Sequence, residues 1–383
     1  MATLGVWRSG STSIVTNGSD PLFLDLLEAY RDARRHKRNT HSQLEFEVDL
    51  ERNLAELYRE LRGRTYRPGT SLCFVVKGTV KREVFASAFR DRVVHHLYYN
   101  YVSPMFERLF IADSYSCRKG RGTSAGVSRL EHHLRSCTRN YTREAWVLQL
   151  DLRGYFMSIS RSRLREVALE ELGRMWPRPC GVAGRRWRDV VDADFVEWLT
   201  RVITSKDPLE GCRRRGPLSD WDDLPESKRL LPSRPGIGLP IGDLTSQLYS
   251  NVFLNRMDQY VKRVLGFGHY GRYVDDFYIV SQSRRALREA VEPIGRFAAG
   301  YGLTLHPGKV RLTRADRRVT FLGMEVEPWR RRRLSRVLAK GRRVCREWAG
   351  RAATAWQLPP LEQLTVLQTA GNVRGSYSGL HVS

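Results

Sequence analysis

The segment GRYVDDFYIV, residues 271–280, places two adjacent aspartates, Asp275 and Asp276, between two apolar runs. A second apolar run, WVLQLD at residues 146–151, ends in Asp151. Both runs are rich in aromatic and β-branched residues and have the length of short strands. Aspartates are also common in solvated hairpin turns, which is the simpler interpretation. However, carboxylates beside apolar strands are costly unless donors or metal ions neutralise them. We therefore predict strands that present these three carboxylates at one site.

Carboxylate oxygens are the ligands that hard cations such as Mg²⁺ prefer. Asp275 follows Asp151 by 124 residues (275 − 151), so only a fold that pairs the two strands can unite the carboxylates. Two Mg²⁺ ions about 3.5–4 Å apart stabilise both the attacking and the leaving oxygen of an in-line displacement. We interpret Asp151, Asp275 and Asp276 as catalytic ligands of two Mg²⁺ ions in nucleotidyl transfer, with Mn²⁺ able to substitute.

The charge of the chain indicates a polyanionic partner. Sixty-five Lys and Arg against 41 Asp and Glu give a net charge of +24. Nucleic acid is the leading partner, because neutralising phosphates releases counterions. A solubilising surface or contact with an anionic membrane are the alternatives. The six cysteines are scattered, and no stretch reaches 18 apolar residues. We therefore expect a cytoplasmic protein without a zinc site and without a membrane partner.

Hydrophobic periodicity predicts an α+β fold. Residues 1–20 have the composition of a loose N-terminus. Residues 205–235 are rich in Pro, Gly and charged residues, which predicts a long functional loop. Residues 330–351 hold ten basic residues and one acid around an apolar stripe, which predicts an amphipathic basic helix. The remaining predicted elements are helices within 21–62, 161–204, 245–264 and 287–301 and over 93–110, and strands at 72–76, 146–151, 271–280 and 320–326.

Several segments, in order, resemble the motifs of reverse transcriptases. DLRGYFMSI (151–159) and GRYVDDFYIV (271–280) are similar to the two acidic motifs. The similarity spans about residues 25–380. It implies a right-hand polymerase fold, with fingers and palm over 21–329 and a C-terminal helical thumb over 330–383. Further similar segments are KREVFASAFRDRVVHHL (81–97) and DSYSCRKGRGTSAG (113–126) in the fingers, LTLHPGKV (303–310) with its lysine, and FLGMEV (321–326) as the primer grip.

A narrower resemblance lies in GIGLPIGDLTSQ, residues 236–247. Its Ile-Gly-x-x-x-Ser-Gln form, from Ile241 to Gln247, is similar to reverse transcriptases of diversity-generating retroelements, where most reverse transcriptases have Gln-Gly-x-x-x-Ser-Pro. The DP…W..LP..K run over 207–228 is also similar to that group, although Arg-Leu-Leu follows at 229–231 where Ser-Leu-Phe is expected. The resemblance implies an RNA-directed DNA polymerase that is error-prone at adenines during mutagenic retrohoming. Its implied partners are a template RNA, the cDNA, dNTPs and a small, basic, oligomeric accessory protein.

The resemblance also implies roles for single residues around the metal site. The carbonyl of Leu152 completes one metal shell. Phe156 is the steric gate that excludes a ribose 2′-hydroxyl. Ile241 and Gly242 line the nucleotide site, where Ile241 offers packing in place of a hydrogen bond.

Basic residues receive phosphate-binding roles. Arg82 resembles the fingers arginine that clamps the incoming triphosphate, because guanidinium binds phosphate through paired hydrogen bonds. Lys77 and Arg118 are weaker candidates for the same task. Lys309 is a candidate general acid toward pyrophosphate. Arg330, Arg331, Arg332 and Arg333 are expected to bind the template–primer phosphates.

Two alternatives stay open. The first is another prokaryotic reverse transcriptase, intron-encoded or used in antiphage defence. The second is a non-catalytic RNA-binding scaffold with a relic palm, against which the intact Asp151, Asp275 and Asp276 argue. Primer extension separates enzyme from scaffold, and a genomic repeat pair that differs at adenines separates retroelement mutagenesis from the other enzymes.

Overall fold

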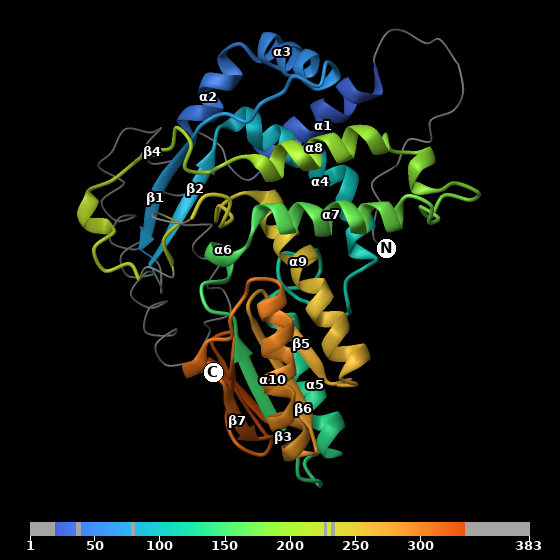
Figure 1. Ribbon diagram of the computed structural model, residues 1–383, viewed down its shortest axis with the longest axis vertical. Helices are drawn as coiled ribbons and strands as arrows, with labels where there is room; N and C mark the ends of the chain where they lie inside the picture. The colour runs from blue at the N-terminus through green and yellow to red at the C-terminus, as the bar shows by residue number, and fades with distance from the viewer. Residues whose placement is uncertain (1–19, 36–39, 78–80, 226–227, 231–233, 334–383) are drawn as a thin grey trace, which may run out of the picture.

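A computed structural model describes residues 20–35, 40–77, 81–225, 228–230 and 234–333 of the chain. The fold is α+β, with a helical upper part and a lower part built on a sheet (Figure 1). The α+β class of the predicted right-hand polymerase fold is confirmed, and its division into fingers, palm and thumb stays a prediction. Residues 1–19 of the predicted loose N-terminus and all but the first four residues of the predicted thumb lie outside the described residues, while Asp20 caps the first helix.

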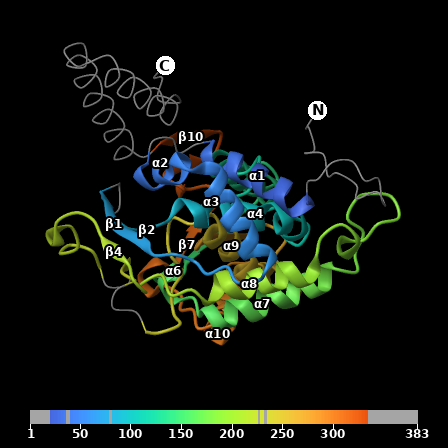
Figure 2. The same cartoon turned by 90° about the horizontal axis from the view of Figure 1, so that it is seen from above.

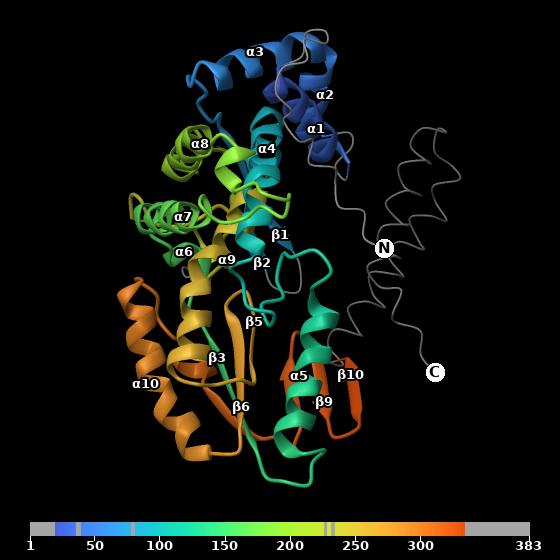
Figure 3. The same cartoon turned by 90° about the vertical axis from the view of Figure 1, so that its right-hand side faces the viewer.

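The palm sheet has four antiparallel strands in the order β5-β6-β3-β7. Helices α10 and α5 lie on opposite sides of this sheet (Figure 3). The elements are β3 (Trp146–Asp151), β5 (Tyr270–Tyr273), β6 (Asp276–Ser281), β7 (Arg311–Arg314), α5 (Thr123–Thr138) and α10 (Arg284–Gly300).

The two central strands, β3 and β6, are mostly apolar between their ends because both faces of the sheet are buried there. Successive side chains of a strand point to opposite faces. On β6, Phe277 and Ile279 join the main core, with Leu287 of α10, while Tyr278 and Val280 join the core under α5. Burial on both faces explains the run at 147–150, which is apolar except for Gln149, and the continuous apolar run at 277–280.

The upper part packs helices around α4 (Phe89–Glu107), which lies in the main core. Helices α7 (Arg161–Met175) and α8 (Ala193–Ser205) run side by side (Figure 2). The other helices are α1 (Pro21–Arg34), α2 (His41–Val48), α3 (Leu50–Arg62), α6 (Tyr155–Ser158) and α9 (Leu244–Gln259), with short turns of helix at η1 (Trp187–Asp189), η2 (Leu218–Asp220), η4 (Tyr260–Val264) and η5 (Pro307–Lys309). In the described helices, none is long and apolar enough to cross a membrane.

The fingers sheet consists of β1 (Ser71–Lys77), β2 (Lys81–Ser87) and β4 (Arg213–Arg214), in the order β2-β1-β4. Strand β4 belongs to the segment that we predicted as a long loop, and it pairs in parallel with β1. Buried Glu83 of β2 fixes the rest of this segment, because it accepts hydrogen bonds from Trp221 Nε1 (2.8 Å) and from the backbone N–H of Leu230 (2.5 Å). The segment is therefore docked on the fingers.

Two predictions near the end of the described chain are wrong. Residues 320–326 form not one strand but two, β8 (Val319–Phe321) and β9 (Met324–Glu327), because Leu322 and Gly323 both have positive φ and form a two-residue turn. Arg330–Arg333 form strand β10 and not the start of a helix. The register of β10 on β9 places Arg330 opposite Glu327 and Arg332 opposite Glu325. Opposite charges across an antiparallel pair favour this strand over a helix.

Candidate active site

The pairing of β3 with β6 places carboxylates from distant parts of the chain side by side. Asp151, the last residue of β3, is the direct partner of Asp276, the first residue of β6. Residues directly opposite in an antiparallel pair have Cα atoms about 4.5–5.5 Å apart. The backbone N–H of Leu152 donates to the carbonyl of Asp275 (3.3 Å), which holds the turn against the end of β3. The structure thus brings the three predicted aspartates together.

Like charges dominate the electrostatics of this cluster. The pKa of Asp276 rises to about 7, through desolvation and through the charges of Asp275 and Asp151. Because Asp276 is exposed, the charges of the neighbouring carboxylates explain its raised pKa better than desolvation does. The pKa of Asp275 is also raised, by desolvation first and then by the charge of Asp151. A site with this excess of negative charge favours a cation.

Two cations moderate that charge. Lys309 Nζ lies 2.6 Å from Asp151 Oδ2, and its side chain is half exposed. The charges of Lys309 and Arg82 both lower the pKa of Asp275, so Arg82 of the fingers acts across the same site. Lys309 therefore contacts the aspartate cluster directly, whereas Arg82 acts on it only through its charge.

The donor set suits a hard divalent cation, because it consists of carboxylate and carbonyl oxygens. Leu152 and Leu305 form an antiparallel bridge through hydrogen bonds from Arg153 N to Thr304 O (2.8 Å) and from His306 N to Asp151 O (2.7 Å). These bonds do not use the carbonyl of Leu152. Within the described residues, no three acidic, His or Cys side chains stand in a ready-made metal-ligating arrangement. Lys309 binds one carboxylate oxygen of Asp151, and a metal ion that used this oxygen would have to displace the lysine.

Phe156 lies at the junction between the palm and the segment before α9. It is half-buried, and its ring meets Tyr155 edge-on with centroids 5.4 Å apart. Its carbonyl accepts a hydrogen bond from the N–H of Leu239 (2.8 Å), and Tyr155 is anchored to Ser250 of α9 through its hydroxyl. Phe156, five residues after Asp151 in the sequence, therefore lies beside Leu239 in the segment 236–242.

Ile241 and Gly242 pack against strand β2. The N–H of Phe85 donates to the carbonyl of Ile241 (2.8 Å), and the Ile241 side chain is half-buried. Gly242 has φ +134°, and a Cβ there would lie 2.4 Å from the carbonyl oxygen of Phe85. Glycine is therefore required at 242 by the close approach of two backbones.

Five other predicted basic residues lie elsewhere or cannot be placed. Arg118 binds Glu107 and the carbonyls of Ile111 and Ser114 within its own loop, so the structure gives it a structural task. Arg331 donates to Ser128 Oγ of α5 (3.0 Å), on the sheet β10-β9-β8. The side chain of Lys77 lies outside the described residues, as do those of Arg332 and Arg333.

The sequence did not reveal the role of Arg272, which precedes the aspartate turn by two residues. Its side chain is fully buried, and it binds the turn and helix α9. A charged residue inside a predicted strand could have indicated this role, because such residues are rarely buried without a partner.

Comparison with known families bears on the second half of this site. Residues 231–326 match the family model described as reverse transcriptase (RNA-dependent DNA polymerase). The match includes α9, both turn aspartates and Lys309, but it does not extend to Asp151. Over these residues the chain is similar in sequence to the reverse transcriptase domain.

Individual proteins are similar to parts of the chain. Protein YkfC of Escherichia coli (strain K12) is 23% identical over 269 residues, which cover 62% of this chain and 60% of that protein. A Candida tropicalis telomerase, solved in complex with a TWJ fragment of telomeric RNA, is 10% identical with a TM-score of 0.47, covering 82% of this chain and 54% of that one. The Candida albicans telomerase, also with a TWJ fragment of telomeric RNA, has 10% identity, a TM-score of 0.45 and coverage of 82% and 55%. The chain spans less than two thirds of the length of each of these proteins.

Proposed function

We propose that the protein is an RNA-directed DNA polymerase that copies a template RNA into cDNA. The observation that carries this proposal is the register of β3 on β6, which unites Asp151 with Asp275 and Asp276 at one end of the palm sheet. The reverse transcriptase match over residues 231–326 supports it. The +24 charge of the chain supports a nucleic acid substrate.

Each residue of the site has a part in this reaction. Asp151, Asp275 and the Leu152 carbonyl would hold Mg²⁺, and Asp276 adds charge or a weaker contact. When bound, the two ions stabilise charge on the attacking 3′-oxygen and on the leaving pyrophosphate. Arg82 orients the triphosphate. Lys309, once released from Asp151, donates a proton toward the pyrophosphate.

The shape of the nucleotide site supports selection of deoxynucleotides. Phe156 lies next to the segment that carries Ile241 and Gly242, where its ring limits the space for a sugar. We further propose that the enzyme serves a diversity-generating retroelement and copies adenines with errors. The Ile-Gly-x-x-x-Ser-Gln form at 241–247 supports this narrower function. A structured template RNA and a small, basic, oligomeric accessory protein are the partners that this function would require.

Primer extension on poly(rA) with oligo(dT) tests the polymerase. Asp275→Asn keeps the shape of the side chain but removes the charge that offsets Mg²⁺, so we expect extension to fall by several orders of magnitude. Filter binding of the template–primer should stay within about twofold, because Asp275 binds no phosphate directly. Extension by Asp275→Asn at a rate near that of the wild type would contradict the metal assignment.

Asp316→Asn is the matched control. Asp316 is an exposed carboxylate that pairs with Arg314 (2.7 Å), so its substitution makes the same chemical change in the same domain. We expect full activity from this variant. To test the narrower function, cDNA from the purified protein is sequenced with and without copurifying partners. Errors concentrated at template adenines support the retroelement, and an even error spectrum contradicts it.

A further inference from the structure

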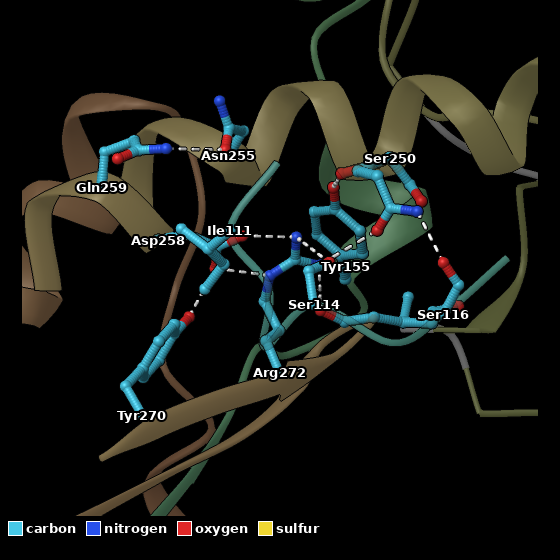
Figure 4. Close-up of polar contacts among 12 residues, drawn as sticks. Ile111, Ser114, Ser116, Tyr155, Ser250, Asn255, Asp258, Gln259, Tyr270 and Arg272 are labelled. Carbon is cyan, nitrogen blue, oxygen red and sulfur yellow. Dashed lines mark hydrogen bonds and ion pairs between the residues drawn. The ribbon is translucent and has the colours of Figure 1, made fainter. Parts of the chain in front are cut away.

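Arg272 lies in β5, two residues before the aspartate turn, and its guanidinium is fully buried. Figure 4 shows it between Asp258 of α9 and Ser114. Its N–H groups meet five acceptors, which is the full donor capacity of a guanidinium. These acceptors are both carboxylate oxygens of Asp258 (2.7 Å each), Ser114 Oγ (3.2 Å), Asn251 Oδ1 (3.4 Å) and the carbonyl of Val274 (3.0 Å).

The pair with Asp258 makes Arg272 rigid. Arg272 Nε and Nη2 each meet one oxygen of Asp258, in the paired geometry that guanidinium and carboxylate favour. The hydroxyl of Tyr270 donates to the same carboxylate (2.6 Å), and Asp258 is also fully buried. A buried ion pair of this kind is weak grounds for expecting added stability, because desolvation offsets the attraction. Its position therefore calls for another explanation.

The Val274 carbonyl gives that explanation. Val274 has φ +56°, a left-handed conformation that is strained for a β-branched residue. Such a conformation persists only where the surroundings hold it, and it is common at functional sites. Arg272 Nη1 donates to the carbonyl of Val274, and Leu152 N donates to the next carbonyl, that of Asp275. The strained turn is thus held from both sides.

The same side chain connects the turn to two further elements. Asn251 of α9 accepts from Arg272 and donates to the carbonyl of Ser116 (2.7 Å). The backbone of Arg272 bonds to Asp113 O (2.8 Å) and Tyr115 N (3.0 Å). Arg272 therefore joins helix α9, the loop around residues 113–116 and the aspartate turn at one point.

We propose that Arg272 is a positioning residue, which clamps the strained Val274 carbonyl to α9 and so fixes the direction of Asp275 and Asp276. This rests on the proposed function. It assigns the alignment of the turn carboxylates to a side chain that touches neither substrate nor metal.

Arg272→Lys tests the clamp. Lysine keeps the charge that pairs with Asp258, but its single ammonium lacks the planar fork and cannot serve Asp258 and Val274 together. We expect kcat to fall by between about tenfold and 100-fold, because small misplacements of catalytic groups have effects of this size. KM for the dNTP should stay within about twofold. Amides of residues 273–277 should exchange faster in hydrogen-exchange mass spectrometry.

Arg256→Lys is the matched control. Arg256 lies on helix α9, as does Asp258, the partner of Arg272, and it pairs with Glu171 (2.6 Å) on the side toward α7. It should lower the unfolding midpoint comparably and leave kcat and the exchange of the turn unchanged. Equal loss of kcat in both lysine variants would overturn the clamp, since general destabilisation would explain it.

A double variant, Arg272→Met with Asp258→Leu, covers the case in which Arg272→Lys does not fold. Replacing a buried ion pair by apolar residues often preserves stability. The clamp predicts a folded protein with low kcat and fast exchange at 273–277. Recovery of wild-type kcat would show that the pair is only structural.

The exchange measurement separates this proposal from the proposed function. If the wild type extends no primer, the polymerase assignment fails, while faster exchange of the turn in Arg272→Lys still supports the clamp. If the wild type is active and exchange at 273–277 is unchanged in Arg272→Lys, the clamp fails and the polymerase stands.

Discussion

At the scale of the residue, we expect the side chain of Ile241 to influence the proposed nucleotide site through packing, without reacting. Its carbonyl is committed to Phe85 of β2, so the backbone is fixed whatever the side chain. The side chain is half-buried and lies next to position 242, where only glycine fits. An apolar side chain there offers packing and no directed hydrogen bond to an incoming nucleotide.

We predict that Ile241→Gln lowers misincorporation opposite template adenine by up to about tenfold. One positioning hydrogen bond contributes roughly 0.5–1.5 kcal/mol, and 1.4 kcal/mol is a factor of ten in selection. Extension opposite the other template bases should change little. Sequencing cDNA made by both proteins on one adenine-containing template measures this. Identical error spectra would contradict a fidelity role, and equal slowing at every base would indicate that Ile241 only fills space.

At the scale of the element, strand β10 changes how the basic segment is presented. A helix would spread Arg330 to Arg333 around its axis, whereas strand residues alternate between two faces. Arg330 and Arg331 are exposed, and Arg331 also reaches Ser128 of α5. The two side chains thus point to opposite faces of the small sheet.

The double variant Arg330→Gln, Arg331→Gln tests the proposed phosphate contacts of β10. Each lost phosphate contact lowers the slope of log K against log salt by about 0.9 on a duplex, so we expect a decrease of at most about 1.8. Affinity for unrelated sequences should fall alike, because phosphate contacts carry no sequence information. Binding titrations from about 50 to 200 mM salt measure both effects.

Arg285→Gln with Arg296→Gln on α10 is the control for the same change of net charge. Both side chains are exposed and pair only with glutamates one turn away on their own helix among the described contacts. A specific contact at β10 predicts that this control leaves the slope unchanged. Equal decreases in both variants would assign the effect to the overall field of the protein.

At the scale of the whole molecule, the buried His133 links folding to pH. It lies on α5 against the palm sheet, with its Nδ1 3.2 Å from the hydroxyl of Tyr278. Burial lowers its pKa to about 3, although the charge of Asp113, 3.9 Å away, acts in the other direction. The other charged or titratable groups that bear on it are Arg129, His269 and Lys262, which lower its pKa further.

The sign of this effect follows from proton uptake. Between pH 6.5 and about 3 the unfolded chain binds a proton at His133 and the folded protein does not. The folded state is therefore destabilised as the pH falls through this window, by about 1.4 kcal/mol per pH unit at most. His133→Gln keeps a hydrogen-bond acceptor for Tyr278 but cannot take up a proton. The unfolding free energy should therefore decline less steeply from pH 6 to 4, by up to about 1.4 kcal/mol per pH unit.

Urea unfolding at a series of pH values measures this slope. His41→Gln is the control, because His41 is exposed on α2 and should not alter it. If His133→Gln declines with pH as steeply as the wild type, proton uptake at His133 does not contribute to acid unfolding.

The sequence by itself determined the elements whose pattern is local. Apolar runs that end in aspartate predicted β3, β5 and β6, because strands buried on both faces are mostly apolar. Three- and four-residue spacing predicted most helices, and the acidic residue types predicted a cation site. These inferences needed only neighbouring residues.

Only the tertiary structure decided which distant groups meet. The pairing of Asp151 with Asp276, and the clamp of Arg272 on Val274, depend on sheet register and on helix α9. Residues Arg330–Arg333 pair as a strand with β9, in a register that places Arg330 opposite Glu327, although their local pattern predicted a helix. The hydrogen bonds of Trp221 and Leu230 to Glu83 likewise depend on a partner far away in sequence. Local pattern fixes what a segment prefers, but the free energy of long-range pairing and burial decides between preferences that differ by only about 1 kcal/mol.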